Sequence, residues 1–231
     1  MSSAAFNKEF RASFETGSGG SFKAEHIKIV GPEAEPKGGN WFVAVDLAGF
    51  AGLERATTSK QRLLDEHCIV VGKVTPDDDW FIKDIQKGRW GIKETAHKIV
   101  DIIENVQPTA CGIERGALMN AVLPYIMDVA RAKNMYPPAP VPLTHENRIK
   151  NERIVWALQG LLEHGKVSFL RAPWNMDLED QLTQFPSKMV HDDIPDALSY
   201  IAQLAQGRVG EDFSEEADVP YWTPLDEQIG F

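Results

Sequence analysis

The 231-residue sequence has few cysteines and histidines, and it contains no long hydrophobic run. Its two cysteines, Cys68 and Cys111, each lie within an apolar, strand-like stretch. This setting favours two reduced thiols in the core over a redox pair. Two cysteines without clustered histidines also argue against a zinc site. Because no apolar stretch approaches the roughly 18 residues of a membrane helix, we expect no membrane span.

The chain also lacks a secretory leader pattern and a phosphate-binding loop. The N-terminus has no basic region followed by an apolar one, so we expect a protein of the cytoplasm. Gly72-Lys73-Val74 is the nearest approach to a P-loop, but it has neither the upstream glycine nor a hydroxyl after the lysine. The glycines after Asp46 lack the spacing of a dinucleotide-binding turn. A nucleotide-binding fold is therefore disfavoured.

Basic residues are in deficit, with 24 lysines and arginines against 34 acids and a net charge of −10. Nucleic-acid phosphates favour basic surfaces, so this balance argues against tight, sequence-independent duplex binding by this chain alone. It does not exclude local basic patches. A nuclease site needs clustered carboxylates for its metal ions, and these by themselves bias the count toward acid.

The composition divides the chain into three parts. Residues 1–40 are expected to be linker-like, because Gly17-Ser18-Gly19-Gly20 and several prolines lie among scattered phenylalanines that could dock on a neighbouring body. Residues 208–231 form an acidic tail. The part between them, 41–207, carries regular hydrophobic patterning and is expected to be one domain.

Within this domain, apolar periodicity predicts a succession of strands and helices. Strands are expected over 41–46, 67–74, 79–85, 110–114, 141–144 and 166–170, and helices over 91–106, 117–133, 148–164 and 193–206. Three strands in succession followed by alternating helices and strands indicate an α/β protein with a mixed sheet flanked by helices. This order fits the ribonuclease H-like fold.

Acidic residues interrupt the predicted elements at three places. Asp46 closes the first strand and Glu114 closes the fourth, where a carboxylate is costly unless it is paired or bound to a cation. For either acid alone, a solvated strand end or an ion pair remains an equal alternative. Asp193 and Asp196 are three residues apart at the start of the last helix, which places them on one face. Helix capping explains one of them well and both tolerably.

Taken together, these acids describe a site for two Mg²⁺ or Mn²⁺ ions. Three or four carboxylates from separate elements supply the hard oxygen ligands that such ions prefer. We expect Asp46 to bridge the ions, Glu114 and Asp193 to complete the coordination, and Asp196 to bind metal or to support a ligand. His191 is expected to bind metal or to support these ligands, or simply to cap the helix. Asp192 is expected to support the ligands or to cap the helix.

Three stretches carrying the acids resemble one family. They are Trp41–Gly49, Gly112-Ile113-Glu114 and His191–Leu198, which are similar to the nuclease domain of the large terminase subunit of tailed phages. The resemblance covers roughly residues 41–206, and the order of acids is also similar to RuvC-type Holliday-junction resolvases. Asn147–Ile154, Gly165–Phe169 and the Phe6–Phe14 segment favour the terminase.

The resemblance implies a function and partners. A terminase nuclease would cut concatemeric viral DNA in the host cytoplasm with Asp46, Glu114, Asp193 and Asp196 as catalytic residues. Its partners would be double-stranded DNA, the packaging ATPase domain, the small terminase subunit and the portal, with no membrane. Because the P-loop is missing, the motor half is absent from this chain. A junction resolvase, or a non-catalytic docking domain of a packaging motor, remains the alternative.

Five basic residues are candidates for contacts with the DNA backbone. They are Lys60, Arg62, Arg148, Lys150 and Arg153. Like charges three residues apart share a helical face, which favours a phosphate-facing role for the last pair. None of these residues forms a base-reading pattern, so little sequence specificity is expected.

Overall fold

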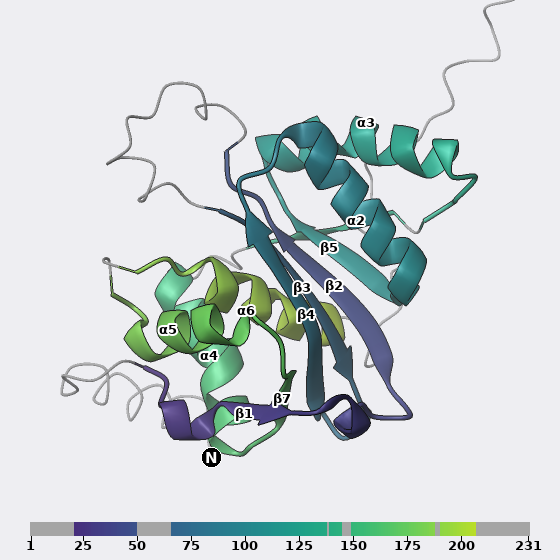
Figure 1. Cartoon of the computed structure of the whole chain (residues 1–231). Helices are drawn as coiled ribbons and strands as arrows, with labels where there is room; N and C mark the ends of the chain where they lie inside the picture. Colours follow the sequence, from purple (N-terminus) through teal and green to yellow (C-terminus); the bar gives the residue numbers. More distant parts are fainter. Residues whose placement is uncertain (1–20, 50–65, 138, 145–148, 188–189, 207–231) are drawn as a thin grey trace, which may run out of the picture.

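In the described part of the chain, seven strands form one mixed sheet through the middle of the molecule (Figure 1). The computed structural model describes residues 21–49, 66–137, 139–144, 149–187 and 190–206. The strands are β1 (Lys28–Val30), β2 (Asn40–Asp46), β3 (His67–Val74), β4 (Trp80–Gly88), β5 (Ala110–Glu114), β6 (Val141–Leu143) and β7 (Val167–Leu170). They lie in the order β1-β7-β4-β3-β2-β5-β6. β3 is antiparallel to β2 and β4, and every other pairing is parallel.

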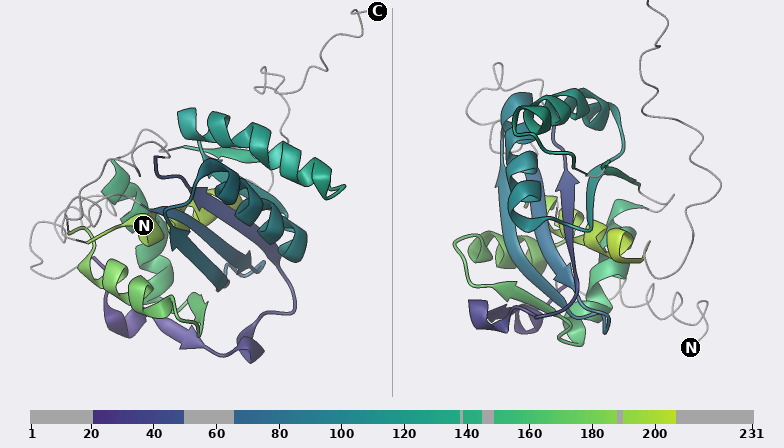
Figure 2. Two further views of the ribbon diagram at one scale, coloured as in Figure 1. Left: turned by 45° about the horizontal axis from the view of Figure 1, so that its top comes forward. Right: turned by 90° about the vertical axis from the view of Figure 1, so that its right-hand side faces the viewer.

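Helices cover both faces of the sheet (Figures 1 and 2). Those in the described residues are α2 (Ile92–Val106), α3 (Ala117–Ala132), α4 (Lys150–Glu163), α5 (Asn175–Gln184) and α6 (Asp193–Gln206), with short 3₁₀ turns η1 (Ala24–His26) and η2 (Pro32–Ala34). Along β2 the side chains alternate between two cores. Val43 and Val45 pack with α2 and α3, whereas Phe42 and Ala44 pack with α4, α5 and α6. None of the helices in these residues is long and apolar enough to cross a membrane.

Helix α6 lies deep in the protein, against β2 and β3. Nearly all of its residues are buried, including both aspartates of its first turn. A helix that is apolar on most of its circumference is stable only when it is enclosed. The N–H of Ile194 donates to the Gln181 side chain of α5 at 2.9 Å, which satisfies one of the donors left over at the helix start. The burial of α6 therefore carries its two acids to the middle of the sheet.

The expected fold class is confirmed, and most elements agree with their predicted bounds. The prediction of a linker over residues 1–40 is wrong for residues 21–40, which the structure describes. β1 adds to the sheet by pairing with β7, and Phe22 is buried with its ring centroid 5.7 Å from that of Phe185. Residues 1–20 and 208–231 lie outside the described residues. Both cysteines are buried free thiols, as expected, and burial raises the pKa of Cys111 to about 12.

Candidate active site

Strand alternation and register bring two of the predicted acids side by side. In β2, Asp46 has the same parity as the residues that face α6, and in β5 the same holds for Glu114. β2 and β5 are parallel, with Val45 opposite Ile113. The next residue of each strand is the acid. Both carboxylates therefore lie at the same end of the sheet and on the same face.

The acids line one cavity of about 280 Å³. Its charged residues are Asp46, Glu66, Glu114, Lys150, Asp193 and Asp196. Residues 47–49 complete the wall. The structure thus gathers all four predicted acids, which lie far apart in the sequence, into a single site built from β2, β5 and α6.

Asp46 lies at the crowded centre of this site, with 9% of its surface exposed. Burial raises the pKa of its carboxyl well above the usual range, and the charge of Asp196 raises it further. A hydrogen bond with Glu114 and the charge of that residue act in the same direction, whereas Lys150 opposes them. Carboxylates packed this closely cannot all ionise without a compensating cation. The site therefore favours a positively charged ligand.

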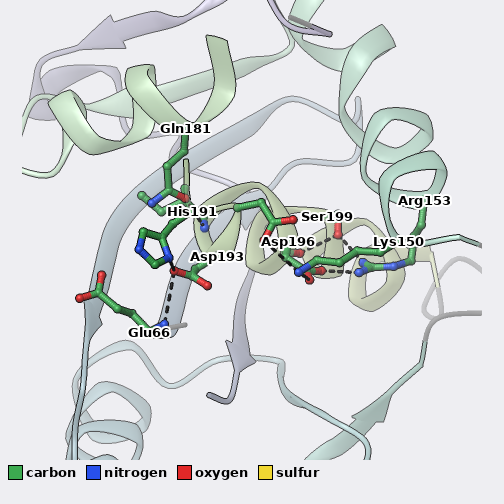
Figure 3. Close-up of polar contacts among 10 residues, drawn as sticks. Glu66, Lys150, Arg153, Gln181, His191, Asp193, Asp196 and Ser199 are labelled. Carbon is green, nitrogen blue, oxygen red and sulfur yellow. Dashed lines mark hydrogen bonds and ion pairs between the residues drawn. The ribbon is translucent and has the colours of Figure 1, made fainter. Parts of the chain in front are cut away.

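Asp193 faces the cavity from the first turn of α6 and is 3% exposed. Its carboxylate accepts a long contact of 3.4 Å from the backbone N–H of Glu66 (Figure 3). The Nδ1 atom of His191 lies 3.6 Å from the same oxygen. His191 is thus placed beside a predicted ligand, as the sequence suggested, although its role stays a prediction.

Asp196 has cations on two sides. Its Oδ2 lies 2.8 Å from Nζ of Lys150, and its Oδ1 pairs with the guanidinium of Arg153 (Figure 3). The same ammonium lies 3.0 Å from Asp192. Arg153 also donates to the Ser199 hydroxyl. These contacts tie the start of α4 to the start of α6.

The phosphate-facing role predicted for Arg153 is wrong. This side chain is 5% exposed and points inward to α6, where its guanidinium lies 4.3 Å from the ring centroid of Tyr200. Lys150 is 41% exposed and stays accessible at the cavity. The two residues share a helical face, as expected, but that face meets α6. Lys60, Arg62 and Arg148 lie outside the described residues.

Comparison with known proteins decides the family. The profile of the terminase RNaseH-like domain matches residues 54–204, well over half of the chain. The chain belongs to this family. The matched range includes Glu114 and both aspartates of α6, and it begins after Asp46. The resemblance stated from the sequence is therefore confirmed.

Solved structures show that this terminase RNaseH-like domain shares its fold with phage nucleases. The nuclease domain of the P22 large terminase aligns with a TM-score of 0.52 at 14% identity, covering 82% of this chain and 94% of that one. The large terminase nuclease of thermophilic phage G20c with bound magnesium aligns with a TM-score of 0.52 at 12% identity, covering 81% and 98%. Its cobalt-bound form gives 0.53 at 12% identity, with the same coverages. A search of curated proteins gave no match.

Sequence reasoning missed one acid of the terminase domain's cavity. Glu66 precedes β3, and its carboxylate lies 3.2 Å from Nζ of Lys87, which in turn lies 3.1 Å from Asp177. The signal was present in the antiparallel register, because Asp46 is opposite Cys68 and Glu66 is two residues beyond.

A second missed residue, His67, fixes the backbone that follows Asp46. The N–H of Ala48 donates to Nδ1 of His67 at 3.1 Å, and Nε2 on the other side of the ring lies 3.0 Å from the Trp90 carbonyl. Since Nδ1 must accept, the proton resides on Nε2 and the ring is neutral. Neither contact has a sequence signature, because the partners lie 19 and 23 residues away.

The donor chemistry of the cavity fits a divalent cation. Carboxylate oxygens are hard ligands suited to Mg²⁺ and Mn²⁺, and the raised pKa of Asp46 marks a place where added positive charge is favourable. Among the described residues, no group of three or more histidine, cysteine or acidic side chains is arranged so that it could hold a metal ion. The acids line an open cavity, which leaves space for substrate.

Proposed function

We propose that this terminase RNaseH-like domain is a divalent-metal-dependent DNA endonuclease that cuts viral DNA during genome packaging. One observation carries the proposal. Carboxylates from β2, β5 and α6 meet in a single cavity, and burial together with the neighbouring acids raises the pKa of Asp46. The family match supports a nuclease-like domain, and the aligned phage nucleases support the fold.

Two Mg²⁺ or Mn²⁺ ions would be held by the acids of this cavity. Asp46, Glu114 and Asp193 line this cavity together, and Asp46 is the candidate ligand shared by both ions. When bound, such ions activate water and stabilise the leaving oxygen of a phosphodiester. The G20c nuclease structures with bound magnesium and cobalt support divalent-ion use.

The protein's own contribution is to hold the carboxylates of the cavity in fixed positions. The ends of β2 and β5 fix the carboxylates of the buried Asp46 and the half-buried Glu114, while His67 anchors the Ala48 backbone at the rim. Water is the nucleophile in this proposal, so no side chain is required to attack phosphorus. Lys150 places one positive charge at the cavity.

The partners of packaging follow from the same proposal. With a net charge of −10, the domain is suited to DNA that another component delivers. We propose that the packaging ATPase domain, the small terminase subunit and the portal form that context.

Replacing Asp46 by Asn tests the proposal. We expect Asp46→Asn to lower plasmid nicking in Mn²⁺ by at least about 1,000-fold while the circular dichroism spectrum is unchanged, because the central ligand loses its charge. The control is Asp128→Asn on α3, which removes a carboxylate that is 73% exposed and outside the cavity. Nicking by Asp46→Asn at the rate of the control would refute the proposed site.

Two further measurements separate the alternatives left open by the sequence. A junction resolvase would prefer a four-way junction over linear duplex, whereas we expect the domain to cut linear duplex at least as fast. A docking module would show no specific Mn²⁺ uptake by calorimetry, whereas we expect uptake that Asp46→Asn abolishes. Junction preference or absent uptake would each contradict the proposal.

A further inference from the structure

Asp196 is held in a row of charges that runs from the core to the cavity. Behind it, Arg153 is 5% exposed and bonds both the Asp196 carboxylate and the Ser199 hydroxyl. In front of it, the Lys150 ammonium lies 2.8 Å from the other carboxylate oxygen (Figure 3). Both oxygens of Asp196 therefore already have a charged partner.

The inner half of this row is difficult to break. An arginine side chain does not deprotonate in proteins, so withdrawing Asp196 would leave a buried positive charge without its partner. The Ser199 hydroxyl donates to the Asp196 carbonyl at 2.6 Å while it accepts from Arg153, which fixes the geometry from a second direction. The guanidinium also lies against the Tyr200 ring. The ion pair between Asp196 and Arg153 is consequently costly to break.

The outer half places an ammonium at the cavity. Lys150 lies within ion-pair distance of Asp192 and Asp196, and it lines the same cavity as Asp46 and Glu114. Its side chain is 41% exposed, so an anionic ligand can reach it. An ammonium binds phosphate as a point charge, and it is most effective when the protein holds it before the reaction.

We propose that Asp196 is a positioning residue and not a metal ligand: with Arg153 behind it, Asp196 holds Lys150 at the cavity, where the ammonium contacts a phosphate oxygen of the bound DNA. This inference rests on the proposed nuclease function. It revises the ligand set expected from the sequence, leaving Asp46, Glu114 and Asp193 to bind the ions. Lys150 becomes a catalytic residue, and Asp196 and Arg153 act through it.

Metal uptake and cleavage separate these roles. We expect Asp193→Asn to abolish Mn²⁺ uptake in calorimetry, whereas Asp196→Asn and Lys150→Gln keep the Mn²⁺ affinity within about threefold of wild type. Both of the latter variants should lower single-turnover cleavage by about 100-fold, as expected for loss of one preorganised charge. The double variant Lys150→Gln/Asp196→Asn should be no slower than either single variant, because the two residues act as a unit.

Lys166 provides a matched control. Its side chain is 40% exposed and pairs with Asp79 at 2.9 Å, outside the cavity. Lys166→Gln removes a lysine of nearly the same exposure that is also in an ion pair. We expect this variant to cleave at the wild-type rate.

The contact by which Asp196 holds Lys150 in place can be tested without metal or DNA. An amine-reactive label, quantified for each lysine by mass spectrometry, should modify Lys150 about fivefold faster in Asp196→Asn than in wild type. The same label on Lys166 should change less than twofold in Asp79→Asn, because Asp79 is 52% exposed and holds its partner weakly. Should Asp196→Asn fail to fold, Arg153→Met/Asp196→Asn removes the buried charge together with its partner.

Several outcomes would overturn the inference. Loss of Mn²⁺ uptake in Asp196→Asn, to the same degree as in Asp193→Asn, would make Asp196 a ligand. Cleavage by Lys150→Gln at the wild-type rate would show that Lys150 has no role in the reaction. Unchanged labelling of Lys150 in Asp196→Asn would show that Asp196 does not hold it in place. A wild-type chain that neither takes up Mn²⁺ nor cleaves would refute the proposed function and the phosphate contact with it, while the labelling would still decide the hold.

Discussion

The folded structure around Ala48 and Trp90 depends on the charge state of one buried side chain, His67. The residue is 1% exposed, and its ring stacks on Trp90 with centroids 5.9 Å apart. Burial lowers the pKa of His67 from its ordinary value of 6.5, although the Trp90 carbonyl and Glu94 act in the opposite direction. A protonated ring could not accept the Ala48 N–H. The fold therefore requires the neutral form.

This requirement gives a pH dependence with a defined sign. As the pH falls below 6.5, His67 becomes protonated in the unfolded chain but stays neutral in the folded protein. The free energy of unfolding therefore falls between pH 6.5 and the lower pKa that His67 has in the folded protein. We expect His67→Gln to cost about 1–2 kcal/mol in urea unfolding at about pH 8, and the difference from wild type to narrow by about pH 5.5.

The control for this prediction is His97→Gln, because His97 is exposed on α2. We expect His97→Gln to change the free energy of unfolding by less than about 0.5 kcal/mol, as is usual for an exposed side chain. A gap for His67→Gln that stays constant with pH would contradict the neutral-ring assignment.

The sequence located some site residues and concealed others for a physical reason. Asp46 and Glu114 each end an apolar run, so the cost of burying a charge was visible without a structure. Glu66 and Arg153 gave no such signal. The position of Glu66 depends on the β2–β3 register, and the direction of Arg153 depends on which face of α4 meets α6. Spacing predicts a shared helical face but not what that face contacts.

At the scale of elements, predictability follows the strength of the hydrophobic pattern. β3, β5 and α6 have the predicted bounds, because each combines a clear apolar period with a turn residue or an acid at its end. β1 was missed because three residues carry no periodicity. α5 was missed because most of its surface is polar and few of its residues are buried.

The packing of β5 against β6 gives a prediction at this scale. A Cβ built on Gly112 would lie 2.6 Å from Cδ2 and 2.8 Å from Cγ of Leu143, a side chain with no exposure. Gly112→Ala should therefore overpack the core beside Glu114 and cost about 1–3 kcal/mol in urea unfolding. Adding Leu143→Ala should relieve part of that overpacking.

Gly160 provides the opposite case. It lies inside α4, and nothing lies within 4 Å of a Cβ built there. Gly160→Ala should stabilise the protein by about 0.5–1 kcal/mol, because the helix interior favours alanine. Equal effects of the two glycine substitutions would show that contact with Leu143 does not decide the outcome.

At the scale of the whole molecule, residues 21–39, which precede β2, belong to the folded body. β1 extends the sheet beyond β7 by parallel pairing, and the N–H of Ser21 donates to the Phe185 carbonyl at 2.8 Å. Phe22 is 4% exposed and joins the same core as α4, α5 and α6. Glycine and proline content predicted a linker here, since composition cannot show that an edge strand finds a partner more than 100 residues away.

Replacing Phe22 by Ala distinguishes a docked segment from a linker. If Phe22 is part of the core, its truncation removes buried surface and leaves a cavity, and the free energy of unfolding in urea should fall by about 3 kcal/mol in one cooperative transition. Met176→Ala is the control, because Met176 is large and apolar but 80% exposed on α5. A change below about 0.5 kcal/mol for Phe22→Ala, equal to the control, would restore the linker interpretation. A loss of the expected size would instead place the start of the cooperative unit at or before Phe22, ahead of β2.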